Sequence, residues 1–282
     1  MPLYRAFGLT IASDLPLTEL AAGEGAADVR IDLKQGDAPE DLDALGGYAF
    51  RTPDAAFSVR GGDTIQIWPT PGVPREDISI WLLGTVMAAL LHQRGMLTLH
   101  ANCFEYGDGL AVAVGGESGA GKSSMAAMAA DAGFPVLGDD VLALMPGSVE
   151  VRPGVLRLKL WQRDLHLVGH TSKGLERAAS DLDKYHVPLP PVGTGPRKLE
   201  RLYVLEDGDL GFERLRGAAA GEALVAQLYR FEVGQDVRGD KGEQFRQALM
   251  LAHQIQVWRF TRPRGDDGLA IAFEALTDHL GT

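Results

Sequence analysis

The residues best suited to chemistry form one glycine-rich run, Gly116-Glu-Ser-Gly-Ala-Gly-Lys-Ser123. It matches the phosphate-binding loop pattern in full, with a strand-like run before it and a helix-forming run after it. Glycines let successive backbone N–H groups turn inward toward phosphate oxygens, and the helix start adds partial positive charge. A glycine-rich turn that matches by chance is the alternative, but the order of strand, loop and helix favours a nucleotide site.

The loop predicts ATP and Mg²⁺ as cofactors. Lys122 would contact the β- and γ-phosphates, and the Ser123 hydroxyl would ligate the magnesium ion. The residues expected to bind the nucleotide are Gly116, Glu117, Ser118, Gly119, Ala120, Gly121, Lys122, Ser123 and Ser124.

Two adjacent carboxylates, Asp139 and Asp140, end a short hydrophobic run about fifteen residues after the loop. One carboxylate here could hold magnesium while the other accepts a proton from an attacking hydroxyl. Adjacent strand residues point to opposite faces, so the pair must lie in a turn, which Gly138 favours. A solvated turn is the alternative for this pair.

A third candidate, His100, lies on a strand-like run, Leu97-Thr-Leu-His-Ala-Asn102. A lone histidine on an apolar strand is more often a core residue, although it can also stabilise phosphoryl charge or tune a nearby carboxylate.

The surrounding elements divide at the Pro- and Gly-rich stretch near Pro69–Pro74. Residues 1–75 are β-rich and carry no catalytic motif, and residues 76–282 hold the phosphate-binding loop. The later segment is expected to begin with a helix over Asp77–Arg94. Gly169–Pro196 reads as a long loop, and helices are expected over Gly221–Phe231 and Gly242–Gln254.

The strand, the histidine, the hairpin, the loop and the Asp pair together resemble the catalytic core of the HPr serine kinase/phosphorylase family. The matching stretch is Leu97–Leu144. The resemblance implies an α/β fold with α+β character, with a P-loop kinase core of the HPr kinase and phosphoenolpyruvate carboxykinase type behind the β-rich N-terminal region.

The resemblance also implies roles. Asp139 would be the base for the acceptor serine, Asp140 would help Ser123 hold magnesium, and His100 would lie near the γ-phosphate or the base. The family usually has Glu after the P-loop serine, where this chain has Ser124. A later Arg-Asn-Pro signature linked to dephosphorylation is not found, so kinase activity alone is expected.

Flanking motifs are similar to those of HPr-kinase-like proteins of bacterial peptide biosynthesis clusters, which include lasso-peptide kinases. These motifs include Tyr4-Arg-Ala-Phe-Gly8, Pro153–Trp161 and Leu202-Tyr-Val-Leu205. The favoured function is therefore transfer of the γ-phosphate to the C-terminal serine of a lasso precursor peptide. The alternatives are an HPr-type kinase acting on a carrier protein, and a non-catalytic, nucleotide-dependent peptide-binding module.

Composition narrows the partners. The net charge of −11 is unsuited to general nucleic-acid binding, because phosphate contacts need clustered Lys and Arg. A single cysteine, Cys103, excludes an intrachain disulfide, and the start lacks a signal-peptide pattern. The longest apolar stretch is too short to span a bilayer comfortably. We expect a cytoplasmic protein with a peptide or small-protein partner bearing an acceptor serine, no nucleic-acid or membrane partner, and a homo-oligomer compatible with the resemblance.

Overall fold

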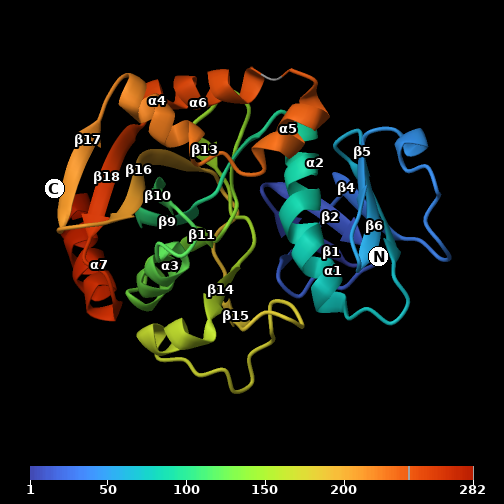
Figure 1. Cartoon of the computed structure of the whole chain (residues 1–282), viewed down its shortest axis with the longest axis horizontal. Coiled ribbons are helices and arrows are strands. Elements are labelled where there is room, and N and C mark those ends of the chain that lie inside the picture. The colour runs from blue at the N-terminus through green and yellow to red at the C-terminus, as the bar shows by residue number, and fades with distance from the viewer. Residues whose placement is uncertain (241, 282) are drawn as a thin grey trace.

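The computed structural model describes residues 1–240 and 242–281, with the side chain of Asp266 set aside. Two large mixed sheets with their covering helices build the chain, which is therefore a mixed α/β protein. Figure 1 shows the N-terminal sheet on the right, the larger sheet on the left, and a long helical run between them.

The N-terminal sheet has seven strands in the order β3-β1-β2-β4-β7-β6-β5. The β-rich character expected of residues 1–75 is confirmed. Phe7 and Gly8 have positive φ and turn the chain between the first two strands, which pair as an antiparallel hairpin. The elements are β1 (Leu3–Ala6), β2 (Leu9–Ser13), β3 (Ala21–Ala22), β4 (Val29–Leu33), η1 (Asp43–Leu45), β5 (Tyr48–Arg51), β6 (Ala55–Arg60) and β7 (Thr64–Pro69).

The helical run after this sheet confirms the helix expected there. It consists of α1 (Arg75–Trp81), a π-helical turn η2 (Leu82–Val86) and α2 (Met87–Gln93). Its buried side chains share one hydrophobic core with the N-terminal sheet. The run therefore packs with the strands that precede it, and the boundary near residue 75 stays a prediction.

The larger sheet has the order β11-β9-β10-β16-β13-β12-β8, and β18 lies parallel to β16 on its other side. Parallel pairing of β10, β16 and β18 brings the ends of these strands to one edge. The strands are β8 (Leu97–Leu99), β9 (Asn102–Gly107), β10 (Leu110–Gly116), β11 (Val136–Gly138), β12 (Leu142–Leu144), β13 (Glu150–Val151), β16 (Arg197–Asp207), β17 (Gly211–Leu215) and β18 (Gln256–Arg262).

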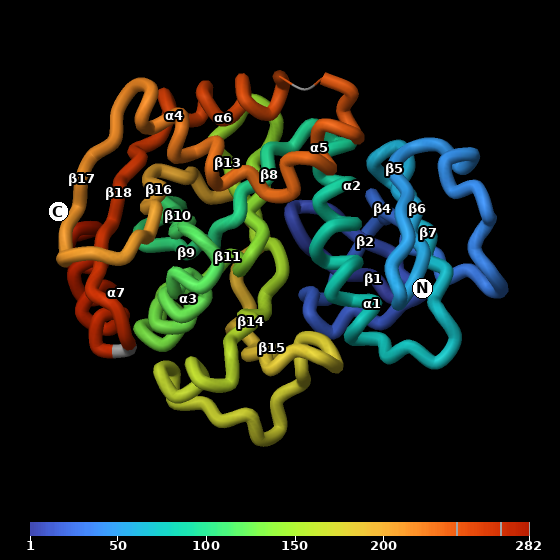
Figure 2. Tube along the Cα trace, in the orientation of Figure 1, coloured from blue at the N-terminus to red at the C-terminus, as the bar shows by residue number. Residues whose placement is uncertain are grey.

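Helices cover both faces of the larger sheet. One hydrophobic core includes α3 (Lys122–Asp131) and α7 (Asp266–Gly281), and another includes α4 (Ala218–Val225) and α6 (Glu243–Gln254). The tube view shows α3 and α7 together on one side, with α4 and α6 along the top (Figure 2).

The helix expected over Gly221–Phe231 is wrong in its second half. The chain leaves α4 after Val225, and Tyr229 N–H then donates to Thr98 O at 3.0 Å, which ties this segment to the sheet. Arg230 has φ 50, a left-handed conformation that stops a right-handed helix. A separate helix, α5 (Phe231–Arg238), follows and packs against α2.

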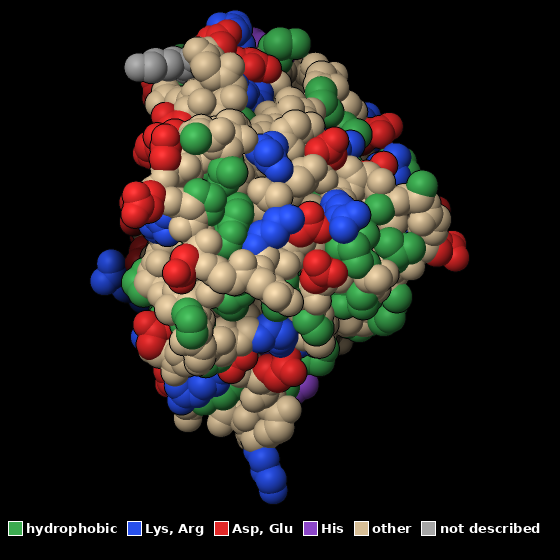
Figure 3. Space-filling model, turned by 90° about the vertical axis from the view of Figure 1, so that its right-hand side faces the viewer, with side chains coloured by type: hydrophobic (Ala, Val, Ile, Leu, Met, Phe, Trp, Pro, Cys, Tyr) green, Lys and Arg blue, Asp and Glu red, His purple; other side chains and the backbone are tan. Residues whose placement is uncertain are grey.

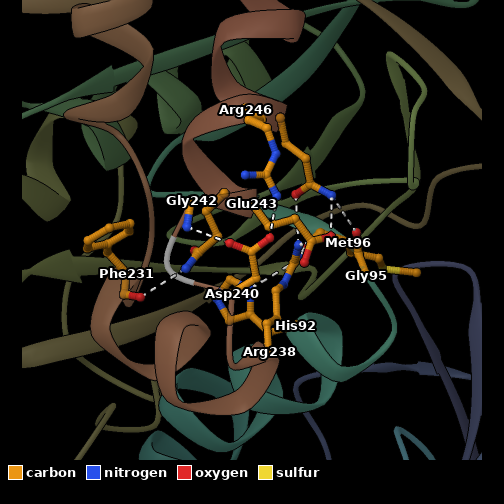
Figure 4. Close-up of polar contacts among 11 residues, drawn as sticks. His92, Gly95, Met96, Phe231, Arg238, Asp240, Gly242, Glu243 and Arg246 are labelled. Atoms are coloured by element: carbon orange, nitrogen blue, oxygen red, sulfur yellow. Dashed lines mark hydrogen bonds and ion pairs between the residues drawn. The ribbon is translucent and has the colours of Figure 1, made fainter.

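Arg238, the last residue of α5, makes polar contacts with residues of the helical run and of α6 (Figure 4). Its guanidinium donates to Met96 O, contacts the His92 ring and pairs with Glu243 at 3.1 Å. The His92 ring is also in contact with the Thr98 hydroxyl at 3.2 Å. These contacts join the helical run to the larger sheet.

The expected loop over Gly169–Pro196 is only partly a loop. It contains β15 (Lys184–Pro188), which pairs antiparallel with β14 (Arg157–Trp161), and η3 (Gln162–Val168) precedes it. The three central residues of this strand, Tyr185, His186 and Val187, are all buried, so it shows no alternating pattern that could mark it as a strand within the surrounding Gly and Pro residues.

The surface over the N-terminal region carries acidic and basic side chains interspersed with hydrophobic ones (Figure 3). Within the described residues, no helix is both long and apolar enough to cross a membrane.

Candidate active site

The glycine-rich loop joins the end of β10 to the start of α3, as its motif predicts. Gly116, Gly119 and Gly121 have φ of 134°, 86° and 102°, which L-residues with side chains rarely adopt. A Cβ on Gly116 would lie 2.6 Å from Leu205 O, and one on Gly121 would lie 2.6 Å from the Leu269 side chain. Both positions therefore require glycine.

Three buried polar side chains hold this loop from separate elements. Gln227 Oε1 accepts from the Gly116 N–H at 2.7 Å, and Arg262 donates to Ala120 O at 2.7 Å. The Asn102 side-chain amide donates to Lys122 O. None of the three was predicted, because no local pattern marks them.

Lys122 curls back over the loop. Its ammonium donates to Gly116 O at 2.8 Å and to Glu117 O at 3.0 Å, and only 8% of the residue is exposed. Burial lowers its pKa, although the nearby Asp140 and Asp139 oppose that shift. A phosphate in the loop would offer this ammonium a charged partner.

The Asp139 carboxylate lies against the first turn of α3. Oδ1 accepts from the Ser123 hydroxyl at 3.0 Å, and Oδ2 accepts from the Lys159 N–H at 3.1 Å. Burial, reinforced by the neighbouring Asp140, raises the pKa of Asp139. A carboxylate and a hydroxyl so close together suit Mg²⁺, which prefers oxygen ligands and keeps several waters.

Asp140 points elsewhere, because its φ of 73° turns the chain between the two carboxylates. Oδ2 accepts from Lys159 Nζ at 3.0 Å, and Oδ1 lies 3.3 Å from His100 Nδ1. Burial alone would raise the pKa of Asp140, but Lys159 and His100 outweigh it and lower that pKa. Asp140 is therefore ionised near neutral pH and can accept a proton.

His100 directly follows β8, where its ring stacks on Tyr229 with centroids 5.7 Å apart. Burial, followed by the charge of Lys122, lowers its pKa, so the imidazole is neutral near pH 7. Its contact with Asp140 makes it a neighbour of the carboxylate pair.

Lys159 joins the two carboxylates and was not among the predicted site residues. It lies on β14, where Leu158 and Leu160 are buried and Arg157 and Lys159 alternate with them. That alternation was the available signal, but it fits a solvated strand face equally well.

A cavity of about 90 Å³ lies over these groups. We name it the P-loop cavity. Nine of the predicted site residues line it: His100, Ser118, Gly119, Gly121, Lys122, Ser123, Ser124, Asp139 and Asp140. Gly116, Glu117 and Ala120 belong to the loop without lining the cavity.

Neither a known protein family nor a curated protein matches the sequence. Among solved structures, this chain is similar to the Hpr(Ser) kinase/phosphatase from Coxiella burnetii, at a TM-score of 0.33 and 15% sequence identity. The similarity covers 65% of this chain and 97% of that one.

Proposed function

We propose that this protein is an ATP-dependent kinase that transfers the γ-phosphate to a serine hydroxyl of a peptide or small protein. One observation carries the proposal. The glycine loop, Lys122 and the Ser123–Asp139 hydrogen bond lie on one side of the turn, while an ionised carboxylate, Asp140, lies on the other. This arrangement suits phosphoryl transfer, which needs phosphate positioning, charge neutralisation and a base for the attacking hydroxyl.

The geometry favours an exchange of the roles expected for the two aspartates. The hydrogen bond to Ser123 places Asp139 where it could share a metal ion with that hydroxyl. Asp140 is partly exposed and lines the P-loop cavity, where an acceptor hydroxyl could reach its carboxylate. We therefore assign Asp140 as the base and Asp139, with Ser123, as the Mg²⁺ ligand.

In the proposed reaction the Asp140 carboxylate accepts the proton of the acceptor hydroxyl. The serine oxygen forms a bond to the γ-phosphorus, and the bond from that phosphorus to the bridging oxygen of ADP breaks. Lys122 and the loop amides hold the phosphates and offset their charge, and bound Mg²⁺ adds to that neutralisation.

The finer parts of the proposal depend on the sequence resemblance. A kinase core of the HPr kinase type, and a lasso precursor peptide with a C-terminal serine as acceptor, both follow from the motifs over Leu97–Leu144 and the flanking segments. The acidic net charge agrees with a peptide rather than a nucleic-acid acceptor.

Removal of the loop ammonium tests the proposal. Lys122→Ala should lower transfer of labelled γ-phosphate to a serine peptide on the order of 10³-fold, because the phosphates lose their charged partner. Thermal unfolding should show that the variant still folds. Lys173→Ala, which removes an exposed lysine, is the matched control. Equal transfer by Lys122→Ala and the wild type would refute the proposed site.

A further inference from the structure

A second cavity of about 220 Å³ meets the P-loop cavity at the carboxylate pair. We name it the acceptor cavity. Asp140, Lys159 and Lys184 line both cavities. The remaining walls come from the segment 80–85 of the helical run, from Ala178 and Leu182, and from Tyr229 and Arg230. The Asp140 carboxylate therefore lies at the boundary between the two cavities.

The wall that the helical run contributes is fixed by hydrogen bonds. Trp81 Nε1 donates to Asp54 Oδ2 at 2.9 Å, which ties α1 to the N-terminal sheet. The buried Asp77 carboxylate accepts from the Ser180 backbone N–H at 2.7 Å and from its hydroxyl at 2.6 Å. The cavity is thus formed before any ligand enters, which lowers the entropy lost on binding.

The π-helical turn shapes the same wall. Gly84 lies in it opposite Tyr229, and a Cβ added to Gly84 would lie 3.3 Å from the tyrosine hydroxyl. π-Helical turns are rare and occur often at functional sites. The turn therefore brings Gly84, which has no side chain, next to Tyr229 in the wall of the acceptor cavity.

Positive charge predominates in the acceptor cavity, although the chain has a net charge of −11. Lys159, Lys184 and Arg230 line it, against the single carboxylate of Asp140, which Lys159 neutralises. Lys184 Nζ lies 4.7 Å from the Trp161 ring centre, and the Arg230 guanidinium lies 5.5 Å from that of Tyr229. In the described part of the chain neither cation forms an ion pair with a carboxylate, so both can receive an anion.

We infer that the acceptor cavity binds the phosphate acceptor. The cavity would select a peptide that has both a carboxylate and an apolar side chain close to the acceptor serine. The inference depends on the proposed function and gives the helical run that packs on the N-terminal sheet a part in substrate recognition. Ile80, Trp81 and Leu182 would contact the apolar side chain, and Lys184 and Arg230 would pair with the carboxylate. That carboxylate can belong to an acidic side chain or to a chain end.

The test uses four fluorescent peptides that each contain one leucine and one serine. In the first pair, with amidated ends, the serine is followed by Asp or by Asn. In the second pair the serine is the last residue and ends in a free carboxylate or an amide. Binding to the full chain in the presence of Mg²⁺ and ADP is measured by fluorescence anisotropy.

Arg230→Asn is the test variant, because Asn tolerates the left-handed backbone at this position while removing the charge. The wild type should bind at least one carboxylate peptide about tenfold more tightly than its amide partner. Arg230→Asn should reduce that preference to about twofold, Arg230→Lys should keep most of it, and Lys173→Asn should leave it unchanged. Whichever pair of peptides discriminates identifies the source of the carboxylate.

A second variant tests the charge preference of the cavity without changing Arg230. Ile80→Glu places a negative charge in the cavity wall, which should repel the carboxylate of the peptide. It should therefore lower the affinity for the carboxylate peptides by about tenfold more than Ile80→Gln does. The inference is overturned if the wild type binds each pair equally, or if Arg230→Asn weakens all four peptides alike. Selective binding without phosphate transfer to any peptide would instead refute the kinase function and leave the cavity assignment intact.

Discussion

The N-terminal sheet and the larger sheet are both covered by helices, but their interiors differ. Around the N-terminal sheet the buried side chains are mostly apolar, as in Ile31, Phe57 and Ile65. At the end of the larger sheet the buried groups include Lys122 and Asp139. Apolar burial needs only a close fit, whereas each buried polar group also needs a partner. We expect substitutions in the first region to affect stability and those in the second to affect activity.

The carboxylate pair provides the largest expected effect. Asp140→Asn should lower kcat on the order of 10³- to 10⁴-fold with little change in ATP affinity, because the base is lost while the phosphate contacts remain. Asp139→Asn should instead raise the Mg²⁺ concentration needed for half-maximal activity. Both parameters come from rates measured over a magnesium series.

If Asp140→Asn alone altered the magnesium dependence, Asp139 would be the base instead, as the sequence resemblance implies. Substitution to Asn preserves shape at both positions and suits the positive φ of residue 140. A difference between the two variants therefore reports on charge rather than on folding.

The N-terminal core should show the converse behaviour. Phe57 is fully buried and stacks on Phe50 with ring centres 5.3 Å apart. Phe57→Ala should lower the free energy of unfolding by about 3–5 kcal/mol, because it leaves a cavity in this core. Denaturant unfolding measures the loss, and the folded variant should bind ATP with wild-type affinity.

Phe57→Leu, which retains most of the volume, should lower the free energy of unfolding by less than about 1.5 kcal/mol. A large change in ATP affinity in either Phe57 variant would show that the two regions are more strongly coupled than their packing indicates.

The smallest expected effect concerns two buried histidines, His92 on α2 and His186 on β15. Burial lowers the pKa of His92 to about 4, helped by Arg238, and that of His186 to about 4, helped by Lys159. The unfolded chain takes up these protons near pH 6.5 and the folded chain only near pH 4, so stability falls as pH drops through that window. Each histidine should lower the free energy of unfolding by about 2 kcal/mol between pH 7 and pH 5.

Urea unfolding at the two pH values measures this loss. His92→Gln should remove the contribution of His92 to the pH dependence of the free energy of unfolding, and His186→Gln should remove that of His186. Each comparison uses the difference between the two pH values, so a change in stability at pH 7 does not affect it. An unchanged pH dependence in both variants would show that the imidazoles are not the groups responsible.

The parts of the fold and of the candidate site that could be predicted are those marked by residues close together in the sequence. The glycine loop, Lys122 and the Asp pair carry short-range motifs, and the structure places them around one cavity. Gln227 and Arg262 brace the loop from distant elements, and their positions depend on tertiary packing that no spacing reveals. The break at Arg230 was hidden for a similar reason, since sheet contacts override helix propensity there.

The acceptor cavity illustrates the same limit. Its walls come from segments more than a hundred residues apart, the helical run and Tyr229–Arg230. The expected helix over Asp77–Arg94 carries no chemical motif, so a part for it in recognition could emerge only from its packing, such as that of α1 against Ser180.

The π-helical turn at Leu82–Val86 makes the acceptor cavity sensitive to the evolutionary insertion or deletion of a single residue. A π-helical turn contains one residue more than an α-helical turn needs, and each α-helical residue rotates the chain by about 100°. Deletion of a single codon there would restore an uninterrupted α-helix but rotate Ile80 and Trp81 relative to α2. Chain length in this turn, more than the identity of any one side chain, decides which residues face Asp140.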